Sequence, residues 1–233
     1  MNGRVALITG ATGGLGRAAA RRLVDAGAVV ALGGTDVGRL EEVASELELP
    51  ADRWAVALGD LTDRRTAREA VDAVVDRFGR VDVLVHAVGG YAGGTPIVEL
   101  DHQELRDLLD QHLWTTLNVM QAVVPGMVER GWGRVIAVAP PLVVTPTGKA
   151  ASYAVSKAAQ DALIRTLAKE VASSGVTANL IVVKAIDEKG ERGTDPKKAS
   201  WTTPDEIAAA ILFLCSDEAA GINGARIPLD GRA

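Results

Sequence analysis

Little in the sequence supports cross-links, a membrane span or contacts with nucleic acid. Cys215 is the single cysteine among 233 residues, which excludes an intrachain disulfide framework and is typical of a reducing compartment. No apolar run reaches the roughly 18 residues of a membrane span, and Met1 is followed so closely by the first predicted strand that no signal peptide is expected. The net charge of −5 and the lack of a basic block argue against nucleic-acid binding. We expect a cytoplasmic protein with neither membrane nor nucleic-acid partners.

Apolar residues make up 48% of the chain, enough to bury the core of one large domain. Short apolar runs predict strands at Val5–Thr9, Val29–Gly33, Trp54–Leu58, Val81–His86, Arg134–Val138, Thr177–Val183 and Arg226–Leu229. Amphipathic stretches predict helices at Gly14–Ala26, Val37–Leu47, Arg64–Phe78, Gln103–Arg130, Ser152–Ser173 and Pro204–Cys215. This alternation predicts one α/β domain over residues 1–233, a Rossmann-type doubly wound sheet of about seven parallel strands flanked by helices.

One polar stretch, Asp187–Ser200, interrupts this alternation. We expect residues 187–203 to form a mobile substrate loop. It is either a lid over the site or a plain solvated connection between two elements.

A glycine-rich turn follows the first predicted strand. Gly10, Gly14 and Gly16 have the spacing Gly-x-x-x-Gly-x-Gly. The first glycine can turn sharply off the strand, the second lets the backbone approach a pyrophosphate, and the third lets the helix pack close to the sheet. The helix N-terminus offers free N–H groups and a partial positive charge to phosphates. The turn therefore predicts a dinucleotide site, and the alternative is a tight turn without a ligand.

Tyr153 and Lys157 are four residues apart in a predicted helix, so they share one face of it. A tyrosine hydroxyl has an ordinary pKa of about 10, and a nearby ammonium lowers this pKa. Tyr153 is then poised to give a proton to a developing oxyanion or to take one from an alcohol. The alternative is an ordinary helix with the tyrosine packed and the lysine solvated. Together with the glycine turn, the pair predicts a nicotinamide-dependent redox site.

These motifs resemble those of the short-chain dehydrogenase/reductase family, and the similarity extends over nearly the whole chain. Gly59-Asp60-Leu61 stands where the family's adenine-binding Asp follows the third strand. His86-Ala87-Val88-Gly89 stands where the family usually has Asn-Asn-Ala-Gly, and only the last Gly is kept. Ile222-Asn223-Gly224 to Leu229-Asp230-Gly231 is similar to the family's C-terminal strand signature.

The resemblance implies that Tyr153 and Lys157 are catalytic and that Lys157 also holds the nicotinamide ribose. It implies the following cofactor-binding residues: Gly10, Thr12, Gly13, Gly14, Leu15, Gly16, Gly34, Thr35, Asp60, Leu61, Ala87, Val88, Gly89, Tyr153, Lys157, Val183 and Ile186. No metal is expected.

Other positions depart from the family pattern. Counting back from Tyr153, the family's Ser falls at Pro140, which has no hydroxyl; the nearest hydroxyls are Thr145 and Thr147. Counting back from Pro125, the family's helix Asn falls at His112, which either holds a water in a proton relay or fills space. The Pro-Gly that commonly follows the sixth strand reads Val183-Lys184.

Dihydropteridine reductase-like members of the family also lack the serine and keep Tyr-x-x-x-Lys. Their Gly-Gly-aromatic-Ala-Gly-Gly loop resembles Gly89-Gly90-Tyr91-Ala92-Gly93-Gly94, and Trp114-Thr115 and Ser200-Trp201-Thr202 are similar to two of their segments. We expect Tyr91 either to stack on a planar quinonoid ring or merely to cover the loop. Tyr91, His112 and Pro140 are therefore the candidate substrate contacts.

The cofactor's ribose is expected near the end of the second strand. An acidic residue there binds the 2′-hydroxyl of NAD and repels a 2′-phosphate. The position falls at Gly34, followed by Thr35, which favours NADP(H) over NAD(H). Arg39 and Arg17 are the candidate cations for the phosphate, and Asp36 is an alternative ribose ligand.

The leading hypothesis is an NAD(P)H-dependent oxidoreductase that moves hydride to or from a carbonyl, an alcohol or a quinonoid, pteridine-like substrate. A 3-oxoacyl reductase is the family default. The alternative is an NAD(P)-binding sensor or partner subunit with little catalysis, because the family's Ser and Asn are replaced by Pro140 and His112.

We also expect a homo-oligomer, either a dimer or a homotetramer. The helices predicted over Gln103–Arg130 and Ser152–Ser173 are apolar on more than one face, and family members commonly pair these helices. The apolar residues that could serve both an inner and an outer surface are Val119, Met120, Val123, Val124 and Met127. A role in the core alone is the alternative.

Overall fold

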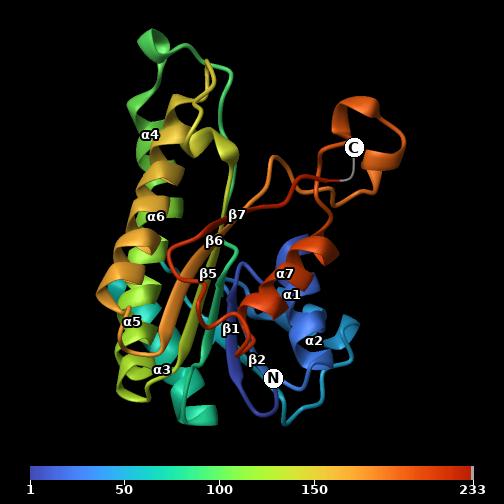
Figure 1. The fold of residues 1–233 in the computed structure, drawn as a ribbon, viewed down its shortest axis with the longest axis vertical. Helices are drawn as coiled ribbons and strands as arrows, with labels where there is room; N and C mark the ends of the chain where they lie inside the picture. Colours follow the sequence, from blue (N-terminus) through green and yellow to red (C-terminus); the bar gives the residue numbers. More distant parts are fainter. Residues whose placement is uncertain (232–233) are drawn as a thin grey trace.

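Seven parallel strands form one sheet in the computed structural model, which describes residues 1–231 (Figure 1). They are β1 (Val5–Thr9), β2 (Val29–Gly34), β3 (Trp54–Leu58), β4 (Val83–His86), β5 (Gly133–Ala139), β6 (Val176–Val182) and β7 (Arg226–Pro228). Their order is β3-β2-β1-β4-β5-β6-β7, and each neighbouring pair is parallel. The order reverses between β1 and β4, which makes this the switch point where doubly wound sheets bind ligands. The predicted fold class is confirmed.

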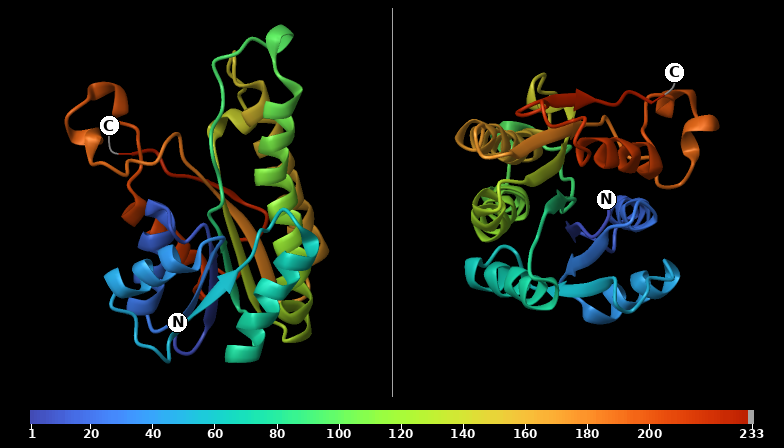
Figure 2. Two further views of the ribbon diagram at one scale, coloured as in Figure 1. Left: turned by 180° about the vertical axis from the view of Figure 1, so that it is seen from behind. Right: turned by 60° about the horizontal axis from the view of Figure 1, so that its bottom comes forward.

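Helices cover both faces of the sheet. They are α1 (Gly14–Asp25), α2 (Val37–Glu46), α3 (Arg64–Phe78), α4 (His102–Leu109), α5 (Thr115–Glu129), α6 (Ala151–Glu170) and α7 (Pro204–Leu214). Figure 1 shows α3, α5 and α6 on one side of the sheet and α1, α2 and α7 on the other, and the right-hand view of Figure 2 shows the same two layers from another direction. Successive strand residues alternate between the layers: in β1, Leu7 packs in the first and Ile8 in the second. Burying such a side chain stabilises the fold by about 2 kcal/mol.

The helix predicted over Gln103–Arg130 is not continuous. The structure divides it into α4, a π-helical turn at Asp110–Trp114, and α5. Thr115 and Thr116 donate their hydroxyl hydrogens to the carbonyls of Gln111 and His112, each at 2.5 Å. Such back-bonding competes with the regular amide ladder and bends helices. The apolar pattern does not reveal this break, although π turns are frequent at functional sites.

The apolar residues of α5 that could have faced a second subunit lie in the core of the chain itself. Val119, Met120, Val123 and Met127 are buried, and Val124 packs against them partly buried. The prediction that these five residues could also form an outer surface is therefore wrong for at least four of them.

Among residues 1–231, no helix is both long and apolar enough to cross a membrane.

The segment 187–203 is held by several polar contacts. The Asp187 carboxylate accepts hydrogen bonds from the N–H groups of Glu191 and Arg192, at 2.8 and 3.0 Å. The Arg192 guanidinium pairs with Glu206 on α7 at 2.7 Å. Two short 3₁₀ turns, Glu191–Gly193 and Pro196–Lys198, complete the segment. Its mobility stays a prediction.

Candidate cofactor and reaction site

Two adjoining cavities open at the carboxyl ends of the strands, of about 700 and about 360 Å³. Both are lined by Gly10, Gly13, Ala87, Val88 and Gly89. The larger one continues to the predicted adenosine-binding residues, Thr12, Gly34, Thr35, Asp60 and Leu61. The smaller one continues to the predicted reacting residues and their neighbours, Leu15, Gly16, Tyr91, Pro140, Tyr153, Lys157, Val183 and Ile186. Of the predicted site residues, Gly14 and His112 line neither cavity.

The glycine turn is packed so closely that a side chain would clash with backbone atoms at two of its positions. Gly10 has φ of +68°, and a Cβ there would lie 2.8 Å from the carbonyl oxygen of Ala87. A Cβ on Gly16 would overlap the carbonyl oxygen of Gly10. Gly13 caps the N-terminus of α1 without a side-chain hydrogen bond. This close packing requires glycine at Gly10 and Gly16, and it brings the N-terminus of α1 to the two cavities, where its partial positive charge would attract a pyrophosphate.

Glu188 lies against this turn, which the sequence did not predict. A Cβ on Gly14 would be 2.8 Å from the Glu188 Oε1 atom, and Glu188 lines the smaller cavity. The carboxylate thus occupies space at the N-terminus of α1, where the helix dipole attracts anions. A phosphate bound at this turn would meet a like charge.

Lys157 is buried beside the reaction site. Its Nζ donates hydrogen bonds to the Val138 carbonyl at 3.1 Å and to Gln160 Oε1 at 2.9 Å. Burial lowers the pKa of Lys157 to about 8. The side chain is therefore positioned by helix α6 and strand β5 together.

Tyr153 lies one helical turn before Lys157, in the lining of the smaller cavity. Burial, and to a smaller extent Tyr91, raise the pKa of Tyr153. The prediction that Lys157 lowers this pKa is therefore wrong for this structure, since the ammonium binds Val138 and Gln160 and desolvation of the phenol dominates.

The chain's other tyrosine, Tyr91, meets Tyr153 at the cavity mouth. Their ring centroids are 5.0 Å apart with an interplanar angle of 73°, an edge-to-face contact. Tyr91 is 69% exposed, so most of its ring remains free. Pro140 is buried in the lining at the end of β5, whereas Thr145 and Thr147 are not part of that lining. Neither threonine replaces the missing serine hydroxyl there.

Two histidines are buried next to Lys157. The His86 ring contacts the hydroxyls of Thr9 and Thr115, at 2.8 and 3.3 Å. His112, on the π turn, bonds the loop after β4 and helix α6. Burial and then Lys157 lower the pKa of each to about 3, with His112 contributing further at His86. Both imidazoles are neutral near pH 7.

Two of the three side chains predicted near the cofactor's ribose, Asp36 and Arg17, already have partners within the chain. Asp36 caps α2, accepting a hydrogen bond from the Arg39 N–H at 3.1 Å. Arg17 forms an ion pair with Glu46 and donates to the Thr12 carbonyl. The Arg39 side chain is exposed. Asp36 therefore has a structural role that does not require a ligand.

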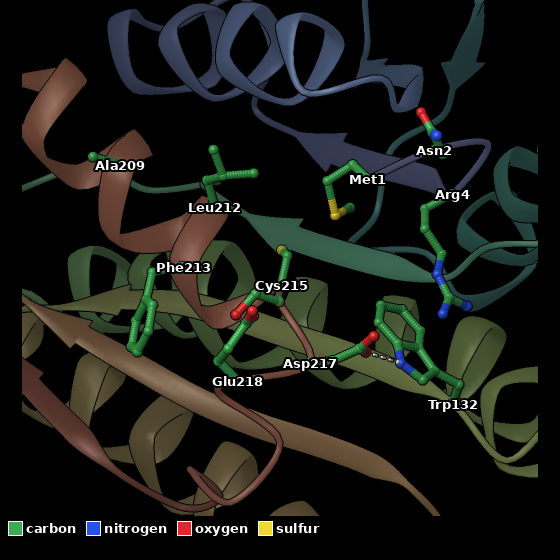
Figure 3. Close-up of a pocket in the computed structure, with 11 residues that line it drawn as sticks. Met1, Asn2, Arg4, Trp132, Ala209, Leu212, Phe213, Cys215, Asp217 and Glu218 are labelled. Atoms are coloured by element: carbon green, nitrogen blue, oxygen red, sulfur yellow. Dashed lines mark hydrogen bonds between the residues drawn. The ribbon is translucent and has the colours of Figure 1, made fainter.

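A third cavity, of about 790 Å³, lies at the opposite end of the sheet (Figure 3). Two of its charged side chains have partners within the chain: the Arg4 guanidinium lies 3.6 Å from the Trp132 ring centroid, and Trp132 Nε1 donates to Asp217 at 3.3 Å. Doubly wound sheets bind ligands at the carboxyl ends of their strands. The candidate site is therefore the pair of cavities at those ends, and not this third cavity.

In the described part of the chain, no cluster of three or more histidine, cysteine or acidic residues could hold a metal ion.

The chain is similar to known proteins over most of its length. A family model described as short chain dehydrogenase matches residues 4–198. The chain is 34% identical, over 233 residues, to (2S)-[(R)-hydroxy(phenyl)methyl]succinyl-CoA dehydrogenase subunit BbsC of Thauera aromatica, covering 96% of this chain and 91% of the relative. It is 31% identical to 3-oxoacyl-[acyl-carrier-protein] reductase FabG of Thermotoga maritima, covering 99% and 98%. The crystal structure of levodione reductase has a TM-score of 0.89 and 28% identity, covering 99% and 97%.

Proposed function

The chain belongs to the short-chain dehydrogenase/reductase family, and we propose that its NAD(P)-dependent oxidoreductase activity uses Tyr153 as the acid/base and Lys157 as its partner. One observation carries the proposal: the hydroxyl-bearing Tyr153 and the buried Lys157 line a cavity that adjoins the glycine turn. The substrate is a carbonyl, an alcohol or a quinonoid, pteridine-like ring. Proton transfer by a positioned side chain accelerates such reactions about 10²- to 10⁴-fold.

The residues around the two cavities fit a dinucleotide. The N-terminus of α1, next to the cavity-lining Gly10 and Gly13, would take the pyrophosphate. Thr35 and Asp60 would face the adenosine, and Lys157 and Ile186 would hold the nicotinamide ribose. When bound, the nicotinamide supplies or accepts hydride. Tyr153 exchanges a proton with the substrate oxygen or nitrogen. Since Pro140 offers no hydroxyl, a substrate that is already polarised, such as a quinonoid ring, suits this site.

We propose that NADP(H) is favoured over NAD(H), because Gly34 carries no carboxylate and Asp36 serves as the cap of α2. Parallel calorimetric titrations of NADPH and NADH should give a micromolar dissociation constant for NADPH and one about tenfold or more weaker for NADH. Asp36→Asn is the matched variant, since asparagine also caps helices. If this substitution weakens NADH binding about tenfold, Asp36 binds the ribose instead. Binding of neither nucleotide would contradict the proposed function itself.

Glu188 is expected to weaken cofactor binding. Replacing it with glutamine removes a negative charge from the N-terminus of α1, and we expect nucleotide binding to tighten about threefold, more at low salt. Glu191→Gln is the control, because Glu191 lies in the same segment but pairs with Lys198 at 2.7 Å. Equal effects of the two substitutions on calorimetric affinity would show that only the net charge of the segment matters.

A second candidate function is a partner subunit with little catalysis of its own. It is favoured by Pro140 at the serine position and by the relative from Thauera aromatica, whose name describes a dehydrogenase subunit. Tight nucleotide binding without turnover, across 3-oxoacyl thioesters and quinonoid dihydropteridines, would favour this candidate.

A dimer or homotetramer stays a proposal, supported by the exposed apolar Val128 on α5 and Val155 on α6. The cytoplasmic location stays a prediction.

A further inference from the structure

His112 stands out because it is fully buried and near the reaction site, yet lines neither cavity. Its Nε2 atom lies 3.3 Å from the backbone nitrogen of Gly90, in the loop after β4. Its Nδ1 atom lies 2.8 Å from the hydroxyl oxygen of Ser156 on α6. One side chain thus joins the loop of Gly89–Gly94 to the helix that carries Tyr153.

The partners of His112 fix where its proton lies. The Gly90 N–H can only donate, so Nε2 is the acceptor and the single ring proton is on Nδ1. Nδ1–H then donates to Ser156, whose hydroxyl donates to the Tyr153 carbonyl at 3.1 Å. Both ring nitrogens are therefore in use, and a second ring proton would point at the Gly90 N–H.

The groups that face the ring also disfavour a charged imidazole. These groups are Lys157 and Tyr153 on α6 and His86 on β4. The Tyr153 ring centroid is 5.7 Å from that of His112. None of these three side chains is an anion near pH 7, and the Lys157 ammonium would repel a positive charge on the ring.

We propose that His112 is a positioning residue that fastens the Gly89–Gly94 loop to α6, and not a member of a proton relay. Tyr91 directly follows the fastened Gly90, and its ring meets that of Tyr153. Gly89 faces Lys157, since a Cβ there would be 3.7 Å from the Lys157 Nζ atom. The bond from His112 therefore sets the loop, and with it Tyr91, against the reacting tyrosine. The kinetic part of this inference rests on the proposed function, but the structural part does not.

Amide hydrogen exchange at Gly90 tests the structural part without cofactor or substrate. His112→Phe keeps a ring of similar shape and removes both nitrogens, and we expect Gly90 to exchange about tenfold faster in it. His102→Phe is the control, since His102 is exposed at the start of α4, and it should leave Gly90 unchanged. Unchanged Gly90 exchange in folded His112→Phe would overturn the proposal. If that variant does not fold, Ser156→Ala decides, because losing the Nδ1 partner frees the ring and should speed Gly90 exchange about threefold.

Kinetics on a turned-over substrate separate positioning from proton relay. We expect His112→Phe to raise KM about tenfold and to change kcat less than about threefold. The apparent pKa values in the pH profile of kcat/KM should stay unchanged. A shift of either apparent pKa in that profile, or a loss of kcat without a change of KM, would overturn the positioning role in favour of a proton relay. If the wild type shows no turnover, the proposed function fails while the exchange result at Gly90 still stands.

Discussion

Tyr153→Phe is expected to lower kcat about a thousandfold and to change the dissociation constant of the nucleotide less than about twofold. We propose that the phenol hydroxyl is the proton donor, because Pro140 in the same lining has no hydroxyl and both nitrogens of His112 are bonded elsewhere. Phenylalanine keeps the ring and its contact with Tyr91, so the cavity should keep its shape. Steady-state rates and calorimetric binding, measured on the same preparation, give both quantities.

Tyr91→Phe is the matched control for this experiment. It removes the same hydroxyl from the neighbouring ring, 5.0 Å away, and should change kcat less than about threefold. Turnover by Tyr153→Phe at the wild-type rate would contradict the acid/base role of Tyr153. A wild type that binds nucleotide and turns over nothing would instead favour the partner-subunit hypothesis.

The parts of the site that the sequence could predict are those set by local geometry. Gly16 follows from the close approach of one turn to its own helix, and Tyr153 and Lys157 follow from the spacing of one helix face. The alternation of apolar strands and amphipathic helices is sufficient to predict the parallel sheet and the helix layers on its two faces.

Other features depend on contacts between distant segments, which no local pattern records. Glu188 reaches the turn at Gly14 from a segment more than 170 residues later in the chain. The bonds of Lys157 to Val138 and Gln160 decide the surroundings of its ammonium, so the pKa of Tyr153 could not be read from the spacing. Threonine pairs occur in many regular helices, so Thr115 and Thr116 do not by themselves predict a π turn. The sequence therefore does not predict the break before α5, where these two hydroxyls bond to backbone carbonyls.

Loss of stability in mild acid is the second large effect that we expect. In the unfolded chain a histidine takes up a proton near pH 6.5, whereas His86 and His112 in the folded chain do so only near pH 3. Between these pH values the unfolded state binds more protons, so the free energy of unfolding falls as the pH falls. The slope is up to about 1.4 kcal/mol per pH unit for each histidine. Urea denaturation at intervals from pH 7 to 5 measures it, and Asp and Glu remain largely ionised in this range.

His86→Asn separates the two histidines, since asparagine can still hydrogen-bond Thr9 and Thr115 but does not titrate. We expect about half of the pH dependence to remain in this variant, the half that belongs to His112. His102→Asn, at an exposed position, should leave the slope unchanged. A wild-type free energy of unfolding that stays level from pH 6.5 to 5 would mean that water or local opening lets the two imidazoles charge in the folded state. The neutral His112 on which the loop attachment depends would then be lost well above pH 3. The protection of the Gly90 amide, measured relative to its intrinsic exchange rate at each pH, should fall over the same range.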